Sequence, residues 1–343
     1  MSLYNQSSQE DYLLEVKHLE TAFEIEGELY NAVDDVSFVV NKNQIIGIVG
    51  ESGCGKSVLS LSIMKLVSHE NGRIQGGELI FNGKHLEQMK EGDMNKMRGK
   101  DISMVFQEPM TSLNPVFTIG YQIQEILLNH IKLSKEEARF ESIALLKSVG
   151  IPRPDEIINE YPHQLSGGMR QRVMIAIAIA CQPKLLIADE PTTALDVTVQ
   201  AQILELLKEI QKVNEMSVLL ITHDLGVIAE MCDEVLVMYA GKIVERTNVD
   251  TLFYGPKHPY TKLLMRAIPK MDEDVESLTT ISGMVPSLKN MPRKGCRFYN
   301  RCPAKMPRCE RITPQLSEIE IGHFVSCLLY EESRHIEGEN RYE

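Results

Sequence analysis

The segment Gly50-Glu51-Ser52-Gly53-Cys54-Gly55-Lys56-Ser57 carries the residue types that bind a polyphosphate. It fits the pattern GxxxxGK[ST] at every position. Glycines let backbone N–H groups turn inward around a phosphate, and the positive end of a following helix points to the same place. Lys56 would reach the β- and γ-phosphates of ATP, and the Ser57 hydroxyl would bind Mg²⁺. The alternative is a chance glycine turn. It is disfavoured because an expected strand precedes the segment and an expected helix follows it.

Two adjacent carboxylates, Asp189 and Glu190, follow the apolar run 185–188. A strand that delivers a carboxylate to the edge of a sheet can hold Mg²⁺, which we expect of Asp189. Glu190 is then free to act as general base on the attacking water. By itself this pattern is often only a strand end, but together with residues 50–57 it predicts hydrolysis of ATP. His223 follows another apolar run and either reaches the γ-phosphate or bonds to backbone.

Apolar periodicity predicts elements that could position these groups. Strands alternate with helices, which predicts an α/β fold with a largely parallel sheet covered on both faces. A hairpin is expected over 234–246, with its turn at Ala240-Gly241. The other expected elements are strands at 13–19, 32–40, 44–49, 185–188 and 218–222, and helices at 56–67, 122–130, 135–149 and 197–214.

Composition restricts the partners of the chain. Its 343 residues carry a formal net charge of −12, which argues against nucleic acid or an anionic membrane surface as the main partner. The polar, acidic start does not resemble a secretory signal. The longest apolar stretch, 173–181, is about half of what a membrane span needs. We therefore expect a cytoplasmic protein that reaches a membrane only through a partner.

The composition changes after about residue 255, where prolines recur and four cysteines follow. Cys296, Cys302, Cys309 and Cys327 have the spacing C-x5-C-x6-C-x17-C. Four thiolates can close a tetrahedral zinc site or hold an iron–sulfur cluster, and free thiols are the third alternative. The lack of a C-x2-C pair mildly disfavours zinc. We expect a small, irregular, Cys-rich C-terminal domain with the metal site in a structural role.

The segment Leu165-Ser166-Gly167-Gly168-Met169-Arg170-Gln171 resembles the LSGGQ signature of ABC ATPases, with Met169 where glutamine is more usual. The resemblance implies a P-loop NTPase of ABC type, with a RecA-like core, an antiparallel β subdomain and a helical subdomain. In that family the signature completes the ATP site of the opposite subunit. Two ATP molecules would then be sandwiched between two such domains.

Further family roles can be carried over residue by residue. Gln107 resembles the Q-loop glutamine, which contacts Mg²⁺ and senses the γ-phosphate. Asp196, in Ala194-Leu195-Asp196, resembles the D-loop that touches the partner subunit, and His223 resembles the switch histidine. Phe23 resembles the aromatic that stacks on adenine, and Tyr30 competes for this role.

Three segments resemble a narrower group, the ATP-binding subunits of dipeptide and oligopeptide importers, with nickel importers as close relatives. They are Pro109-Met110-Thr111-Ser112-Leu113-Asn114-Pro115, His258-Pro259-Tyr260-Thr261 and the cysteine-containing tail. Similar tails carry a [4Fe–4S] cluster, which we favour over zinc. The resemblance implies an ABC ATPase domain at 12–255, a helical subdomain at about 108–182 and a transporter-type C-terminal domain at 256–343.

These patterns together predict an ATPase subunit that energises an importer from the cytoplasmic face of the cell membrane. Its expected partners are a second, often non-identical ATPase subunit, two membrane permease subunits and a solute-binding protein. The substrate would be a dipeptide or oligopeptide, or else nickel or another small solute. An exporter ATPase is disfavoured by the tail. An ABC protein acting on ribosomes or DNA is disfavoured by the single signature, the absence of heptads and the acidic charge.

Overall fold

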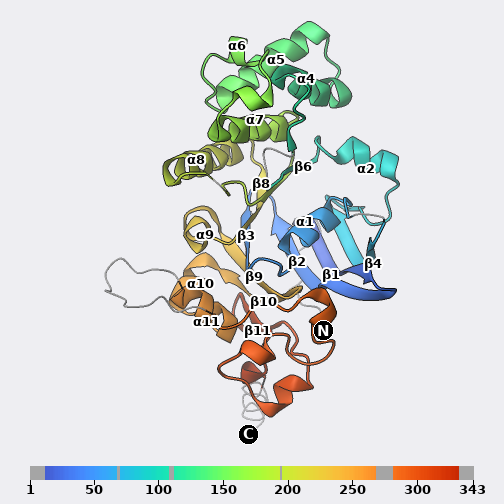
Figure 1. The fold of residues 1–343 in the computed structure, drawn as a ribbon, viewed down its shortest axis with the longest axis vertical. Helices are drawn as coiled ribbons and strands as arrows, with labels where there is room; N and C mark the ends of the chain where they lie inside the picture. Colours follow the sequence, from blue (N-terminus) through green and yellow to red (C-terminus); the bar gives the residue numbers. More distant parts are fainter. Residues whose placement is uncertain (1–11, 68–69, 108–111, 194, 268–280, 332–343) are drawn as a thin grey trace.

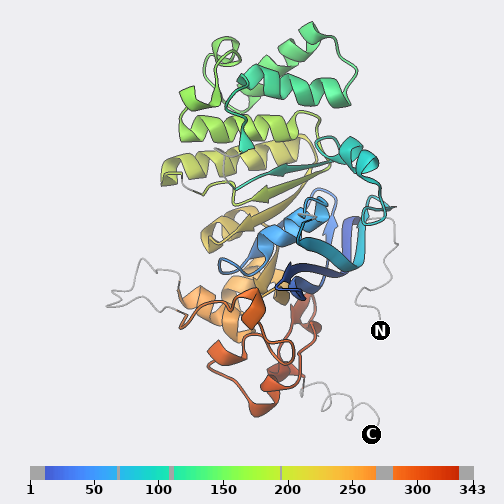
Figure 2. The same cartoon turned by 45° about the vertical axis from the view of Figure 1, so that its right-hand side comes forward.

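The computed structural model describes residues 12–67, 70–107, 112–193, 195–267 and 281–331. Residues 108–111, which include the start of the importer-like segment at Pro109, lie outside this part, as does Ala194 of the expected D-loop. The described residues form two sheets with helices packed around them (Figure 1). Figures 1 and 2 show a group of helices at one end of the long axis and the C-terminal segment at the other.

The central sheet has eight strands in the order β11-β12-β10-β9-β3-β8-β7-β6. Strands β9, β3, β8, β7 and β6 are parallel, whereas β10, β12 and β11 extend the sheet in antiparallel pairs. The strands span β3 Ile45–Val49, β6 Ile102–Val105, β7 Leu185–Asp189, β8 Ser217–Thr222, β9 Glu234–Tyr239, β10 Lys242–Asn248, β11 Ser317–Glu320 and β12 His323–Val325.

The parallel strands are buried on both faces, because alternate side chains enter different cores. Val218 and Leu220 of β8 belong to one apolar cluster, and Leu219 and Ile221 belong to another. This explains the continuous apolar runs in the sequence. The helices are α1 Lys56–Ile63, α2 Glu91–Met97, α4 Ile119–His130, α5 Lys135–Ser148, α6 Pro154–Ile157, α7 Gly167–Ile179, α8 Val197–Val213, α9 Leu225–Met231, α10 Val249–Tyr254 and α11 Pro259–Arg266.

A second, four-stranded antiparallel sheet lies beside α1. Its order is β2-β1-β4-β5, with strands β1 Tyr12–Ile25, β2 Glu28–Asn41, β4 Gly72–Phe81 and β5 Lys84–His85. Both β1 and β2 contact α1, and their apolar side chains share a core with it. The antiparallel β part and the helical part that the family resemblance implied are therefore both present, the latter formed by α4 to α7 (Figure 1).

The structure does not confirm the expected small, irregular C-terminal domain as a separate unit. Strands β11 and β12 continue the central sheet through β10. The buried Glu245 carboxylate of β10 accepts hydrogen bonds from His323 Nε2 of β12 at 2.7 Å and from the backbone N–H of His258 at 2.9 Å. Burial is the largest single influence and by itself would raise the pKa of the Glu245 carboxyl. The hydrogen bonds that the carboxylate accepts together outweigh it, so the pKa is lowered. The tail therefore shares its hydrogen bonds and its sheet with the rest of the chain.

Most predicted elements are confirmed with shifts at their ends. The predicted turn at Ala240-Gly241 is present, with both residues at positive φ, as a two-residue hairpin turn with twisted strands requires. Strands β4 and β6 were not predicted. Strand β4 carries four glycine, arginine or glutamine positions in its first half, and β6 has only four residues, so neither has a clear apolar period.

Candidate active site

The glycine-rich loop connects β3 to α1 at the centre of the central sheet. Strand β3 has β8 and β9 as its parallel neighbours, so the loop leaves from the carboxyl edge of the sheet. Gly55 caps the start of α1 with a φ of 103°. A Cβ atom there would lie 2.5 Å from the carbonyl oxygen of Ala32, so only glycine fits. The loop therefore has the strand and helix context that the motif requires.

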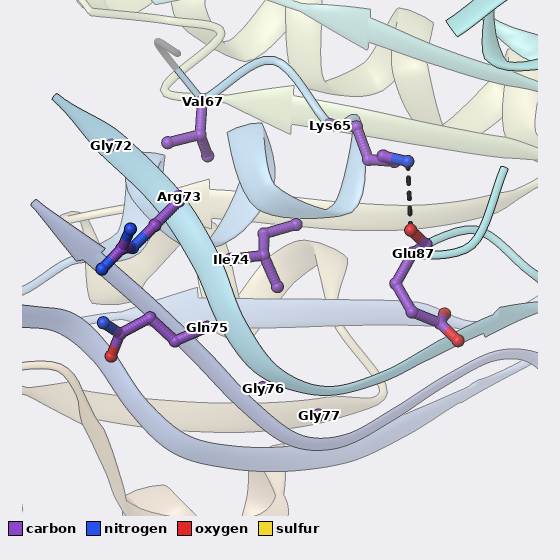
Figure 3. Close-up of a pocket in the computed structure, with 9 residues that line it drawn as sticks. All are labelled: Lys65, Val67, Gly72, Arg73, Ile74, Gln75, Gly76, Gly77 and Glu87. Atoms are coloured by element: carbon purple, nitrogen blue, oxygen red, sulfur yellow. Dashed lines mark hydrogen bonds between the residues drawn. The ribbon is translucent and has the colours of Figure 1, made fainter. Parts of the chain in front are cut away.

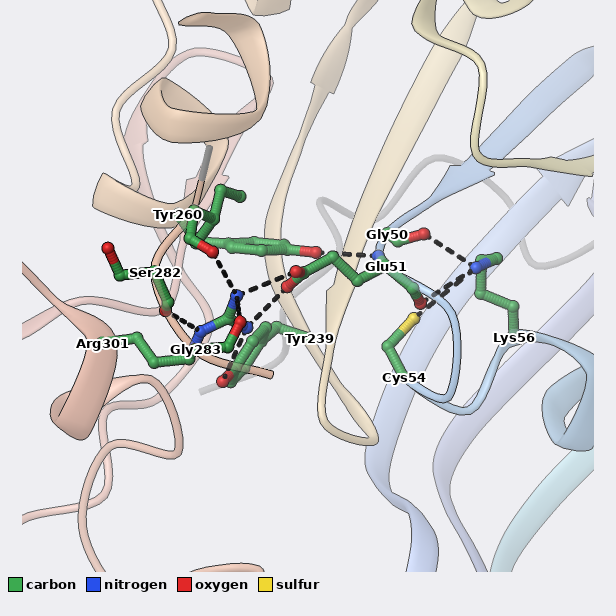
Figure 4. A network of polar contacts seen from close by, with 10 residues as sticks. Gly50, Glu51, Cys54, Lys56, Tyr239, Tyr260, Ser282, Gly283 and Arg301 are labelled. Carbon is green, nitrogen blue, oxygen red and sulfur yellow. Dashed lines mark hydrogen bonds and ion pairs between the residues drawn. The ribbon is translucent and has the colours of Figure 1, made fainter. Parts of the chain in front are cut away.

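Lys56 is turned back over this loop (Figure 4). Its Nζ atom donates hydrogen bonds to the carbonyl oxygens of Gly50 at 2.8 Å and Glu51 at 3.2 Å. The residue is only 5% exposed, although it carries a charge. A buried ammonium group at a helix N-terminus presents concentrated positive charge, which suits an anionic ligand.

Asp189 ends β7, which is separated from β3 by β8. Its Oδ2 atom lies 3.5 Å from the Ser60 hydroxyl, and the Ser57 hydroxyl is near enough to act against the rise in the pKa of the carboxyl. Burial is the main cause that raises its pKa, and neighbouring Glu190 adds to the effect. Its Oδ1 atom is buried and has no hydrogen-bond partner among the described residues. An unpaired carboxylate oxygen next to a serine hydroxyl fits Mg²⁺, which prefers oxygen ligands.

Two predicted residues from separate segments, Gln107 and His223, meet at a third, Glu190. Its carboxylate accepts a hydrogen bond from Gln107 Nε2 at 3.0 Å and lies 3.3 Å from His223 Nδ1. Thr193 Oγ1 donates to it at 2.9 Å. Glu190 has a φ of 47°, an uncommon backbone conformation for a residue other than glycine. Unusual backbone at a polar cluster is typical of functional sites.

The signature segment lies at the start of α7. Ser166 caps this helix and its hydroxyl accepts from the Met169 N–H at 3.3 Å, while Gly167 and Gly168 form the first turn. Leu165 is buried. Helix α7 packs against α4, α5, α8 and β6, whereas α1 packs against β1, β2 and β7. The two candidate anion-binding helix starts thus belong to different parts of the chain.

Asp196, which was expected to belong to the D-loop, caps α8. Its Oδ1 atom accepts a hydrogen bond from the Val199 N–H at 2.9 Å. The next residue, Val197, is an apolar side chain that is 83% exposed. An exposed apolar side chain beside a helix start is compatible with contact to another subunit.

The two aromatics considered for adenine are cross-strand neighbours. Phe23 of β1 pairs with Tyr30 of β2 in the antiparallel register. Directly paired residues point to the same face of a sheet. The Arg293 guanidinium lies over the Tyr30 ring, 5.1 Å from its centroid. Both aromatics are therefore presented by one hairpin.

The expected metal cluster is not supported by the described side chains. Among residues 12–331, outside the undescribed gaps, no group of three or more His, Cys, Asp or Glu side chains is arranged to hold a metal ion. Cys296 and Cys309 are joined by a backbone hydrogen bond of 2.7 Å. Burial, with smaller contributions from the three other cysteines of the set, raises the pKa of Cys296 to about 12. No disulfide joins any of the seven cysteines, all of which lie in the described residues.

Sequence reasoning missed a polar network that holds Glu51 (Figure 4). Arg301 donates to both carboxylate oxygens of Glu51, at 2.6 and 2.8 Å, and Tyr260 Oη accepts from the Glu51 N–H at 2.9 Å. Arg301 lies in the cysteine-containing segment, far from Glu51 in sequence. The residues around Arg301 did not indicate this contact, because two residues so far apart in sequence form no local pattern.

A cavity of about 420 Å³ lies beside the C-terminal end of α1 (Figure 3). Its lining includes Lys65, Arg73 and Glu87, and none of residues 50–57 contributes to it. Lys65 Nζ donates to the backbone carbonyl of Glu87 at 3.2 Å. The cavity is therefore separate from the candidate active site.

No helix in the described parts of the chain has the length and apolar character needed to span a membrane.

Comparison with known proteins identifies the family. Residues 33–193 match the ABC transporter family, and residues 244–309 match the family described as oligopeptide/dipeptide transporter, C-terminal region. The chain is 53% identical to the oligopeptide transport ATP-binding protein AppD of Bacillus subtilis, over 93% of this chain and 97% of AppD. It is 48% identical to the dipeptide transport ATP-binding protein DppD of Escherichia coli, over 92% of this chain and 96% of DppD.

Solved structures show the same fold. The dimeric structure of a post-hydrolysis state of the ATP-binding cassette MJ0796, bound to ADP and Pi, is 26% identical with a TM-score of 0.62. The match covers 69% of this chain and 98% of the cassette. The phosphate loop and the carboxylates at the sheet edge indicate ATP hydrolysis, as do the names of these relatives. The chain is an ATPase and belongs to the oligopeptide and dipeptide transport ATP-binding proteins of the ABC transporter family.

Proposed function

We propose that this chain energises the import of oligopeptides or dipeptides by hydrolysing ATP on the cytoplasmic face of the cell membrane. The observation that carries the proposal is the meeting of Gln107, Glu190 and His223 beside the phosphate loop, in a chain whose C-terminal region matches that of peptide transporters. The curated relatives named above are peptide transport ATP-binding proteins. The chain itself would not contact the peptide.

In this proposal the backbone of residues 50–57 binds the phosphates of ATP. Lys56 exchanges its two loop carbonyl partners for β- and γ-phosphate oxygens. Ser57, Asp189 and Gln107 would hold Mg²⁺, which neutralises charge on the phosphates when it is bound. Phe23 would stack on the adenine ring, with Tyr30 as the alternative from the same hairpin.

Glu190 is the proposed general base. Its carboxylate would accept the proton of the attacking water as the new O–P bond forms and the bond to ADP breaks. Gln107 and His223, which both contact this carboxylate, would orient the water and report the presence of the γ-phosphate. Contact to Gln107, in the segment that enters the helical part, would link the chemistry to movement of α4 to α7.

The second half of each ATP site would come from another ATPase subunit. We propose this role for the N–H groups at the start of α7, next to Ser166, and for Asp196 at the start of α8. Helix α7 packs mainly against α4, α5, α8 and β6, whereas α1 packs mainly against β1, β2 and β7, which supports the proposal. The partner would be homologous, whether identical or not. The cassette MJ0796 mentioned above was solved as a dimer.

Two permease subunits would dock on the helical part, over about residues 107–160. Phe117 and Tyr121 at the start of α4 stack with ring centroids 4.6 Å apart, and both are exposed. Phe140 of α5 is 72% exposed. Exposed aromatic groups of this kind favour a protein partner. A solute-binding protein outside the membrane would complete the system.

The same fold could serve a nickel or other small-solute importer, or an ABC protein acting on ribosomes or DNA. Affinity purification of the tagged chain from its native membrane distinguishes these. We expect two membrane proteins to co-purify, and addition of peptide-loaded binding protein to stimulate ATP hydrolysis. Recovery of ribosomes or DNA without membrane proteins would contradict the proposal, and stimulation by a nickel-loaded binding protein instead would assign the alternative substrate.

Replacement of Glu190 by glutamine tests its role as base. We expect Glu190→Gln to bind ATP but to lower turnover by at least about a hundredfold, because the amide cannot take a proton. The trapped ATP should favour a closed dimer, visible by size-exclusion chromatography. The matched control is Glu205→Gln on the exposed side of α8, which should leave turnover unchanged. Near-normal turnover by Glu190→Gln would exclude it as the base.

For Cys296, Cys302, Cys309 and Cys327 we propose binding of a [4Fe–4S] cluster, with zinc as the alternative. The support is their spacing and the match of this region to the C-terminal region of oligopeptide/dipeptide transporters. Binding would require the four thiols to lose their protons and shift closer together. Its effect would be structural, on a segment rich in prolines.

Metal analysis of anaerobically purified protein tests this. We expect a brown protein with about four irons per chain and absorbance at about 400 nm. Cys302→Ser should lose the colour, whereas Cys181→Ser, outside the set, should keep it. A colourless protein with zinc would assign the alternative metal, and a protein without metal would leave free thiols.

A further inference from the structure

The C-terminal segment reaches directly into the phosphate loop, which the family assignment does not explain. We propose that Arg301 and Tyr260 are positioning residues for this loop, so that the C-terminal segment completes the chain's own ATP site. The inference rests on the proposed role of residues 50–57 in binding phosphate. Its central contact is between Arg301 and Glu51, the second residue of the loop (Figure 4).

The Arg301 side chain is held in place by several contacts besides the one with Glu51. Its guanidinium pairs with both oxygens of Glu51, and the side chain is 7% exposed. The other donors bond the carbonyl oxygens of Ser282 at 2.9 Å and Gly283 at 3.0 Å. The Tyr239 ring lies beneath the guanidinium, with its centroid 5.8 Å away. A planar fork held at this many points defines one position for the carboxylate, which lysine could not do.

Tyr260 holds the backbone of the same loop residue. Its hydroxyl accepts the Glu51 N–H, and its ring is completely buried against Tyr239 and Phe298, at centroid distances of 4.8 and 5.3 Å. Tyr260 lies in the first turn of α11, and Phe298 directly precedes the short turn of helix Tyr299–Arg301. Both anchors of Glu51 therefore come from one packed unit outside the loop.

The negative charge of Glu51 makes its contact with Arg301 important for ATP binding. The Glu51 carbonyl oxygen already accepts from Lys56 Nζ, so the residue lies beside the group that would bind the phosphates. A carboxylate at this place would repel ATP and compete with it for Lys56. Arg301 cancels the charge and turns the carboxylate away from Lys56, toward the C-terminal segment (Figure 4). Loss of Arg301 should therefore weaken ATP binding, and removal of the Glu51 charge should reverse much of that loss.

Calorimetric titration of the full chain with Mg·ATP tests this. We expect Arg301→Ala to raise the Kd by about tenfold, because the part-buried Glu51 carboxylate is left without its partner. Glu51→Gln alone removes the carboxylate charge and supplies the second arm of the double-mutant cycle. The double variant should recover to within about threefold, which a purely structural role of Arg301 would not produce. In the assembled transporter, Arg301→Ala should raise the KM for ATP and leave kcat within about twofold.

Two milder variants carry the test if Arg301→Ala does not fold. Tyr260→Phe keeps the buried ring but leaves the Glu51 N–H unpaired, and Arg301→Lys keeps the charge without the fork. Each should raise the Kd by about threefold. The matched control is Lys257→Ala, which removes the ion pair to Glu320 within the same C-terminal region and does not reach the loop. Its Kd should not change.

Unchanged affinity in Arg301→Ala, or no recovery in the double variant, would overturn the inference. The Lys56→Ala variant separates this result from failure of the proposed site. If Lys56→Ala loses ATP binding while Arg301→Ala binds normally, the phosphate loop is assigned correctly and only the positioning role is wrong. If Lys56→Ala binds ATP as well as the original chain, both proposals are wrong.

Discussion

A parallel sheet brings the carboxyl ends of its strands to one edge, and the arrangement of this ATPase depends on that constraint. Strand β3 delivers the phosphate loop, β7 delivers Asp189 and Glu190, and β8 delivers His223. The order β3-β8-β7 places these three ends next to one another although they are far apart in sequence. Both faces of the strands are covered by apolar clusters, so the edge is rigid and the polar groups on it have defined positions.

The C-terminal segment adds a second constraint to this edge. It continues the central sheet through β10 and β12, is locked there by the buried Glu245 and His323 pair, and extends to Glu51 through Arg301. A chain with this segment therefore has its phosphate loop held from two directions, by β3 and α1 within the cassette and by the tail outside it. The C-terminal segment is therefore structurally joined to the ATPase domain, through the shared sheet and through the contact of Arg301 with Glu51.

The sequence allowed the nucleotide chemistry to be predicted because that chemistry is encoded locally. Residues 50–57 need only a strand and a helix around them, and Glu190 needs only the end of a strand. Gln107 and His223 required the family resemblance, since one residue after a short apolar run has no pattern of its own. Arg301 could not be found in either way, because its partner Glu51 is distant in sequence and an arginine beside a cysteine resembles any surface arginine. The cysteine spacing indicated a metal site and a separate domain, but the segment packs into the main sheet.

We have proposed that this chain contributes its phosphate loop to one ATP site and its signature segment to another. The most direct test is the Ser166→Arg variant in the assembled two-ATPase complex, with ATP binding and turnover measured separately at each site. Turnover at the partner's site should be lost, because a bulky cation replaces the cap of α7, while ATP still binds at this chain's own loop with nearly unchanged affinity. Loss of binding at the chain's own loop, or normal turnover at the partner's site, would contradict the proposal.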